Sequence, residues 1–227
     1  MSEPTGAPDA AVAHRPGLGG YPVNLLVAGR SCVVVGGGPV AARKAEALLD
    51  AGAVVHVVAP DLVDDLSRLA TAGRLVWHPR EFRASDLDGA WLATAATDDP
   101  TVNHAVFEAG EARRVWVNAA DDPQRSSCTL PATLRRGDLV VTIGTGGRSP
   151  ALAVHLRDRL RDELGPEYAV LLDVLAEARD ELRARGRSSV DGGWQRALDS
   201  DLLELLRDGR VAEAKELLRT CLSSSSV

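Results

Sequence analysis

A short apolar run followed at once by three glycines constrains the fold of this chain more than any other feature. Ser31–Val35 is apolar and β-branched, Gly36-Gly37-Gly38 follows it, and Val40–Leu49 carries apolar residues at helical spacing. Val54–Ala59 is then a second apolar run of strand length. A strand, tight turn, helix and strand in this order form a right-handed unit whose two strands are parallel and adjacent. The sequence therefore predicts that a parallel sheet begins here.

The same alternation continues beyond this unit. We expect, in order, a helix near Asp61–Ala70, strands at Arg74–His78 and Ala90–Ala96, a helix at Pro100–Ala112, and strands at Val115–Asn118 and Leu139–Ile143. Alternating strands and helices indicate the α/β class and a doubly wound, mostly parallel sheet of the Rossmann type.

Strand signals disappear after Pro150. Three segments then show apolar residues at three-and-four spacing, namely Ala151–Leu164, Glu167–Ala184 and Trp194–Leu218, which predicts helices. We expect four regions: a disordered tail (1–20), a Rossmann domain (21–145), a helical region (146–222) and a disordered polar end (223–227).

The glycine turn fits the dinucleotide fingerprint, because Gly36-x-Gly38-x-x-Ala41 follows a strand and opens a helix. The first glycine permits the sharp turn, the second lets the backbone approach a pyrophosphate, and the small Ala41 lets the helix pack closely on the strand. The helix N-terminus adds free N–H groups and a partial positive charge. These features predict a bound dinucleotide.

The end of the second strand departs from the fingerprint. Rossmann domains usually place an acid there to hold the ribose hydroxyls, whereas this chain has Ala59-Pro60. Asp61 is the nearest carboxylate, and it either reaches the ribose or caps the next helix. No arginine follows this strand directly to accept a 2′-phosphate, so the sequence favours NAD over NADP.

Composition excludes several classes of protein. The net charge of −6 and pI of about 5.4 argue against nucleic-acid binding, and no apolar run approaches the ~20 residues that cross a bilayer. Cys32, Cys128 and Cys221 lack the spacing of a disulfide framework or a thiolate metal site. The five histidines show no ligand spacing either. We therefore expect a soluble cytoplasmic protein without a resident metal.

Four motifs together resemble a known family. They are Val33-Val-Val-Gly-Gly-Gly-Pro-Val-Ala-Ala-Arg-Lys44, Ala95-Ala-Thr-Asp-Asp99, Val117-Asn118-x-x-Asp121 and Gly146-Gly-Arg-Ser-Pro150. With a match from Tyr21 to about Arg185, the chain resembles the precorrin-2 dehydrogenases and the N-terminal part of siroheme synthase. The resemblance implies NAD-dependent oxidation of precorrin-2 to sirohydrochlorin and, in some members, insertion of ferrous iron as a second substrate. It also implies a homodimer formed through the helical region.

The resemblance assigns roles to individual residues. Asp121 becomes the catalytic carboxylate, and its place after a strand end is independently where open α/β sheets bind ligands. The residues expected beside the cofactor are Gly36, Gly37, Gly38, Pro39, Val40, Pro60, Asp61, Thr97, Asp98 and Asn118.

A second glycine-rich stretch leads directly into a helix and resembles a cradle for anions. The residues expected to contact the carboxylates of a tetrapyrrole are Thr145, Gly146, Gly147, Arg148 and Ser149, with Arg135, Arg136 and Arg157 as further candidates. The alternatives are a flexible connector between domains and a solvated basic helix face.

Two other functions remain open at this point. One is a non-catalytic module that senses NAD and signals to a partner through its C-terminal helices, which does not account for Asp121 and the Gly146–Pro150 segment at the spacing of the family. The other is a dehydrogenase for a different substrate, which the missing acid at Ala59 leaves open.

Overall fold

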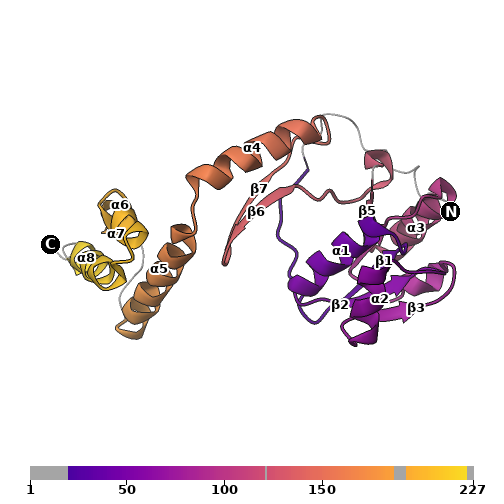
Figure 1. Cartoon of the computed structure of the whole chain (residues 1–227), viewed down its shortest axis with the longest axis horizontal. Coiled ribbons are helices and arrows are strands. Elements are labelled where there is room, and N and C mark those ends of the chain that lie inside the picture. Colours follow the sequence, from indigo (N-terminus) through magenta and orange to yellow (C-terminus); the bar gives the residue numbers. More distant parts are fainter. Residues whose placement is uncertain (1–19, 121, 187–192, 224–227) are drawn as a thin grey trace, which may run out of the picture. The chain divides into compact units, whose positions relative to one another are not determined.

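The computed structural model describes residues 20–120, 122–186 and 193–223 (Figure 1). The chain divides into two compact units, one ending at Leu130 and the other beginning at Pro131. The sequence placed this boundary after residue 145. The disordered tail and end expected from the sequence lie almost entirely outside the described residues, although the last helix extends through Ser223.

The first unit is built on a five-stranded parallel sheet in the order β3-β2-β1-β4-β5. Its strands are β1 (Ser31–Val35), β2 (Val54–Val58), β3 (Val76–His78), β4 (Leu92–Ala95) and β5 (Trp116–Ala119). Its α-helices are α1 (Pro39–Asp50), α2 (Asp64–Thr71) and α3 (Pro100–Arg113), and a 3-10 turn, η1 (Ala84–Leu87), precedes β4. The predicted Rossmann-type sheet is confirmed.

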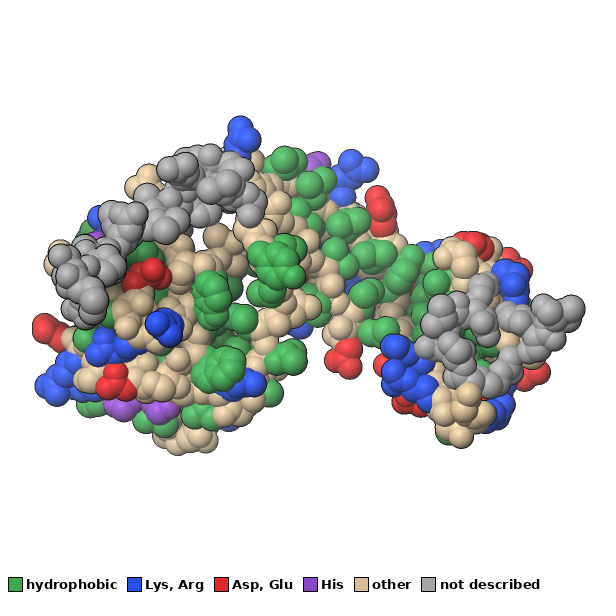
Figure 2. Space-filling view, turned by 180° about the vertical axis from the view of Figure 1, so that it is seen from behind, with side chains coloured by type: hydrophobic (Ala, Val, Ile, Leu, Met, Phe, Trp, Pro, Cys, Tyr) green, Lys and Arg blue, Asp and Glu red, His purple; other side chains and the backbone are tan. Residues whose placement is uncertain are grey.

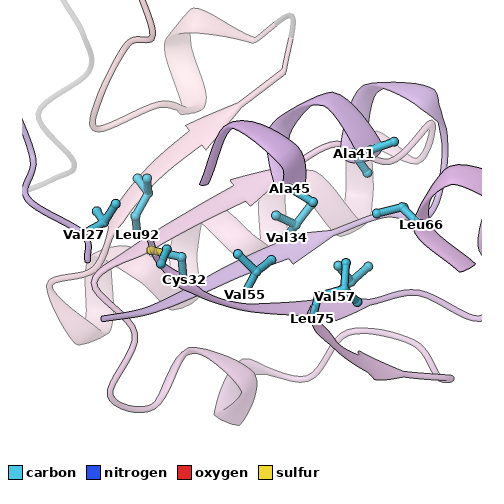
Figure 3. Packing of buried hydrophobic residues seen from close by; sticks show 12 residues of the cluster. Val27, Cys32, Val34, Ala41, Ala45, Val55, Val57, Leu66, Leu75 and Leu92 are labelled. Atoms are coloured by element: carbon cyan, nitrogen blue, oxygen red, sulfur yellow. The ribbon is translucent and has the colours of Figure 1, made fainter. Parts of the chain in front are cut away.

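Two apolar layers cover the sheet, one on each face. Figure 3 shows the layer in which Cys32, Val34 and Val57 meet Ala45 of α1 and Leu66 of α2. The opposite layer packs alternate strand residues against α3. Residues Cys32 to Val35 are at most 2% exposed, which explains why β1 is apolar without polar alternation.

The strand predicted at Leu139–Ile143 forms, but it does not join the parallel sheet. As β7 it pairs antiparallel with β6 (Ala132–Arg136), which the sequence analysis missed, in a separate two-stranded sheet of the second unit. Only Gly137 and Asp138 separate the strands, and Gly137 has φ +56°. Two residues can close a hairpin, whereas adding a parallel strand needs a crossover of about a dozen residues.

The rest of the second unit is helical, as predicted. Its helices are α4 (Pro150–Glu163), α5 (Glu167–Ala184), α6 (Gly193–Leu198), α7 (Leu202–Arg207) and α8 (Val211–Ser223). The single helix expected over Trp194–Leu218 is wrong, because breaks after α6 and after α7 divide the segment, and the second break follows from a glycine with a left-handed backbone. Gly209 has φ +74°, and the Arg210 N–H returns to the Leu205 carbonyl. None of the described helices is both long and apolar enough to cross a bilayer.

Candidate functional site

The first two glycines of the turn after β1 are required by the protein itself. Gly36 has φ +127°, and a Cβ there would overlap the carbonyl oxygen of Ala96 after β4. A Cβ on Gly37 would overlap the carbonyl oxygen of Asp61. The turn therefore packs closely between the segments that follow β2 and β4. This packing explains why both positions are glycine, without reference to a ligand.

Gly38 is different, because the protein does not require a glycine there. Its backbone (φ −85°, ψ −175°) suits any residue, and a Cβ would meet no protein atom within 4 Å. Gly38 is also the N-cap of α1, where no side chain accepts a hydrogen bond and the first turn contains no acid. Open space beside an uncapped helix N-terminus is what the pyrophosphate of a dinucleotide needs, so these residues fit such a cofactor.

The segment after β4 is a tightly bonded turn. Asn103 of α3 accepts from the Thr97 N–H (3.2 Å) and lies 2.9 Å from the Thr97 hydroxyl, and its amide donates to the Thr97 carbonyl (2.9 Å). Asp99 caps α3 by accepting from the Thr101 N–H, and that bond lowers the pKa of its carboxyl group. Asp98, which lies between Thr97 and Asp99 in the sequence, is exposed. Asn103 was not singled out from the sequence. The pattern Asp99-Pro100 predicts where the helix begins, but it does not predict the hydrogen bonds between Asn103 and Thr97.

At the end of β2, Ala59 is buried and Pro60 and Asp61 are exposed. The Ala59 carbonyl accepts a hydrogen bond from the indole of Trp77 (3.0 Å). The N-cap of α2 is Val63, so the alternative role of Asp61 as the cap of that helix is wrong. The Asp61 carboxylate therefore remains available at the sheet edge, beside the glycine turn that its backbone contacts.

After β5, the chain returns along the outer edge of the sheet, and two adjacent serines there contact the backbone of β5. The hydroxyls of Ser126 and Ser127 accept from the Ala119 and Val117 N–H groups (2.9 and 2.8 Å). Asn118 is buried, and its amide donates to the Cys128 carbonyl (3.1 Å). The sequence did not indicate this arrangement, because a Ser-Ser dipeptide is an ordinary loop signal.

Asp121, the predicted catalytic residue, lies outside the described residues. Its neighbours on both sides are described. The Ala120 N–H donates to the Ala95 carbonyl (2.8 Å), and Asp122 accepts from the Gln124 and Arg125 N–H groups (3.2 and 3.3 Å) while pairing with the Arg125 guanidinium (3.0 Å). Burial raises the pKa of the nearby Cys128 thiol to about 11, although the charge of Lys44 lowers it, and this disfavours the reactive thiolate form.

The glycine-rich stretch of the second unit is a hydrogen-bonded turn. The Arg148 N–H donates to the Thr145 carbonyl (3.1 Å), and Gly146 and Gly147 both have positive φ (61° and 74°). The Thr145 hydroxyl donates to the Ser149 carbonyl (3.1 Å), and the Ser149 hydroxyl caps α4 by accepting from the Leu152 N–H (3.2 Å). These bonds argue against a featureless connector.

Two of the further arginine candidates are already engaged. The Arg136 guanidinium donates to the carbonyls of Leu164 (2.7 Å) and Arg161 (2.9 Å) at the end of α4. Arg157 pairs with Asp158 (2.9 Å). Arg148 and Arg135 are exposed. Exposed guanidinium groups are the better candidates for binding a carboxylate, because no internal bond must be broken first.

One histidine pair was missed from the sequence. His56 of β2 and His78 of β3 stack, with Nδ1 and Nε2 3.2 Å apart, and burial together with the charge of His78 lowers the pKa of His56. Across the described parts of the chain, no group of three or more His, Cys, Asp or Glu side chains is arranged to hold a metal ion.

Comparison with known proteins gives three independent likenesses. Residues 23–132 match a family model described as "Putative NAD(P)-binding". The chain is 38% identical over 209 residues to the siroheme synthase of Xylella fastidiosa and 36% identical over 208 residues to siroheme synthase 3 of Aeromonas hydrophila, in each case over 90% of this chain and 44% of the relative. It thus spans less than half the length of these relatives.

The third likeness is to a solved structure. The precorrin-2 dehydrogenase SirC superposes with a TM-score of 0.65 at 26% identity, over 89% of this chain and 99% of that one. The likeness therefore extends beyond the NAD(P)-binding domain into the helical region. The family resemblance drawn from the four motifs is confirmed: the chain is related, over most of its length, to the siroheme synthases and to precorrin-2 dehydrogenase.

Proposed function

We propose that this protein is an NAD-dependent precorrin-2 dehydrogenase that produces sirohydrochlorin. The observation that carries the proposal is the likeness to SirC, which covers 99% of that enzyme's chain and both units of this one. A module that only senses NAD and signals through its helices would also use both units, but it would not account for the likeness to a dehydrogenase over its full length. The open space at Gly38 supports the cofactor part of the proposal independently.

The first unit would hold the cofactor along one edge of its sheet. Gly36, Gly37 and Gly38 with Pro39 and Val40 form the turn and helix start that would bind the pyrophosphate. Pro60 and Asp61 would flank the adenosine ribose, and Thr97, Asp98 and Asn118 the other half of the dinucleotide. When bound, NAD accepts a hydride from the substrate.

The substrate must also lose a proton, and we assign this proton to the Asp121 carboxylate. In the sequence this residue comes two positions after the end of β5, and open α/β folds bind their ligands beyond the carboxyl ends of their strands. The same carboxylate could take the pyrrole N–H protons if ferrous iron is inserted into the product.

The turn of the second unit is proposed to bind the carboxylates of the tetrapyrrole. Arg148 is exposed and offers a bidentate donor, and the backbone N–H groups of Gly146 and Gly147 lie in the same turn. Thr145 and Ser149 would shape this turn through their mutual hydrogen bonds.

The direct test combines the purified chain, precorrin-2 and NAD⁺ under anaerobic conditions. We expect NADH to form in step with the absorbance spectrum of sirohydrochlorin. Intact precorrin-2 that yields no NADH would overturn the proposal and leave the sensing module or a dehydrogenase of another substrate. Binding of NAD⁺ without turnover would favour the sensing module.

Ferrochelatase activity is a second candidate, because siroheme synthases are among the relatives of this chain. The test is the absorbance of sirohydrochlorin with ferrous iron, with and without the protein. A protein-dependent increase in the rate of siroheme formation supports the activity. An unchanged rate contradicts it and leaves the dehydrogenase proposal intact.

A homodimer formed through α4 is also proposed. Three apolar side chains of this helix are 37–48% exposed, namely Leu152, Val154 and Leu156, and only Ala153 of the helix is buried. Figure 2 shows that several apolar side chains are exposed in the view that it presents. Leu152 and Leu156 lie one helical turn apart on the same face of α4, and a second copy of the chain would remove that face from water.

We predict that the double variant Leu152→Glu, Leu156→Glu is monomeric at concentrations at which the wild-type chain is a dimer, as measured by light scattering after size-exclusion chromatography. Leu198→Glu is the matched control, since Leu198 of α6 is 46% exposed. A wild-type monomer, or a dimer retained by the double variant, contradicts this interface.

A further inference from the structure

An arginine–carboxylate pair lies just beyond β3, outside the site described above. The Arg80 guanidinium binds both oxygens of Asp86, at 2.9 and 2.6 Å, and also donates to the Glu81 carbonyl (3.0 Å). The Asp86 side chain is only 9% exposed and accepts a further bond from the Arg83 N–H (2.8 Å). Burial opposes ionisation of Asp86, but these bonds outweigh it and hold its pKa below the usual value.

The backbone places Arg80 beside the strand end that faces the cofactor's ribose. The His78 carbonyl accepts from two N–H groups at once, that of Ala59 (3.3 Å) and that of Arg80 (2.8 Å). Ala59 stands where Rossmann domains usually carry the acid that binds the ribose, and an arginine nearby usually accommodates the 2′-phosphate of NADP. The sequence argument that no arginine stands at this strand end is therefore corrected, because the pairing of β2 with β3 brings one there.

Arg80 is not available to a phosphate in this state. Its bidentate pair with Asp86 would have to open, and a carboxylate that is nine-tenths buried would lose its main partner. The neighbouring charged or titratable groups are the side chain of Arg83, which is exposed, and the stacked imidazoles of His56 and His78.

We propose that Asp86 is a specificity-determining residue that makes the protein prefer NAD over NADP by holding Arg80 away from the 2′-phosphate. The inference rests on the proposed function, in that the first unit must bind a nicotinamide dinucleotide. It makes Asp86, rather than an acid at the end of β2, the group that sets the preference in this chain.

The test measures the affinities of the full chain for NAD⁺ and NADP⁺ by titration calorimetry. Asp86→Asn keeps the shape and the bond from the Arg83 N–H but removes the charge that holds Arg80. We expect NADP⁺ to bind about tenfold more tightly to this variant than to the wild type, as one charge-assisted hydrogen bond permits, with NAD⁺ affinity changed less than about twofold. Asp88→Asn is the control for removing a paired carboxylate from the same segment, since the 66% exposed Asp88 also pairs with an arginine, Arg113 (2.7 Å); it should change neither affinity.

The double variant Asp86→Asn, Arg80→Leu distinguishes Arg80 from Arg83 and the histidines. It should lose the gain in NADP⁺ affinity. An unchanged NADP⁺ affinity in Asp86→Asn, or a gain that survives the loss of Arg80, overturns the inference while NAD⁺ binding still supports the proposed function. If Asp86→Asn does not fold, the single variant Arg80→Leu tests the inference instead. A large loss of NADP⁺ affinity in that variant would show that Arg80 already binds the phosphate in the wild type, and would overturn the inference. A wild-type chain that binds neither dinucleotide overturns both proposals.

Discussion

Gly38→Asp is expected to weaken NAD⁺ binding strongly without lowering the unfolding temperature. A Cβ at this position meets no protein atom, and the backbone suits an N-cap residue, for which aspartate is among the best choices. The variant should therefore fold at least as stably as the wild type. Its carboxylate would stand in the space proposed for the pyrophosphate, and like charges at close range should weaken binding by about a hundredfold or more. Calorimetry with NAD⁺ and thermal unfolding measure the two effects separately.

Two further variants, one at the same position and one at the preceding residue, separate the effect of charge from the effect of shape. Gly38→Asn has the same shape and the same capping ability without the charge, so it should weaken NAD⁺ binding less than Gly38→Asp does. Gly37→Ala should do the opposite, since its Cβ would overlap the Asp61 carbonyl oxygen and force the backbone apart. We expect that variant to lose about 3 kcal/mol of stability. Normal NAD⁺ affinity in Gly38→Asp would show that the cofactor does not cross this turn.

For the ferrochelatase activity proposed above, Asp121→Asn is expected to reduce iron insertion into sirohydrochlorin by about 10²-fold or more, the range over which general bases contribute to catalysis. Formation of NADH from precorrin-2 should fall less, because hydride transfer tolerates a weaker base better than removal of the pyrrole protons does. Affinity for NAD⁺ should not change. The measurements are the initial rates of both reactions and the calorimetric affinity.

The neighbouring carboxylate supplies the control. Asp122→Asn should keep most of the activity, because the amide oxygen can still cap the turn through the Gln124 and Arg125 N–H groups. Iron insertion by Asp121→Asn at the wild-type rate would remove Asp121 from that step. Equal losses in both variants would point to the loop rather than to one carboxylate.

Much of the first unit could be predicted because its signals are local. The buried strand β1, the turn Gly36–Gly38 and the start of α3 at Asp99-Pro100 each depend on residues a few positions apart, which steric and hydrogen-bonding preferences connect directly. The candidate cofactor residues of the glycine turn follow from the same spacing, whereas Pro60, Thr97, Asp98 and Asn118 were assigned only by the family resemblance. Which of the three glycines faces a ligand was also suggested by the fingerprint, and the free space at Gly38 gives that suggestion a physical basis.

The sequence by itself thus determined the class of the fold, the position of the glycine turn and the likeness to the siroheme synthases. Only the tertiary structure decided that β7 pairs with β6 and that the hydroxyls of Ser126 and Ser127 accept hydrogen bonds from the backbone of β5. It also decided that Arg80 lies beside Ala59 and is bound by the carboxylate of Asp86. The reason is physical. Periodicity reports which side of an element is buried, whereas strand partners and ion pairs depend on contacts between distant segments, whose energies no local pattern records.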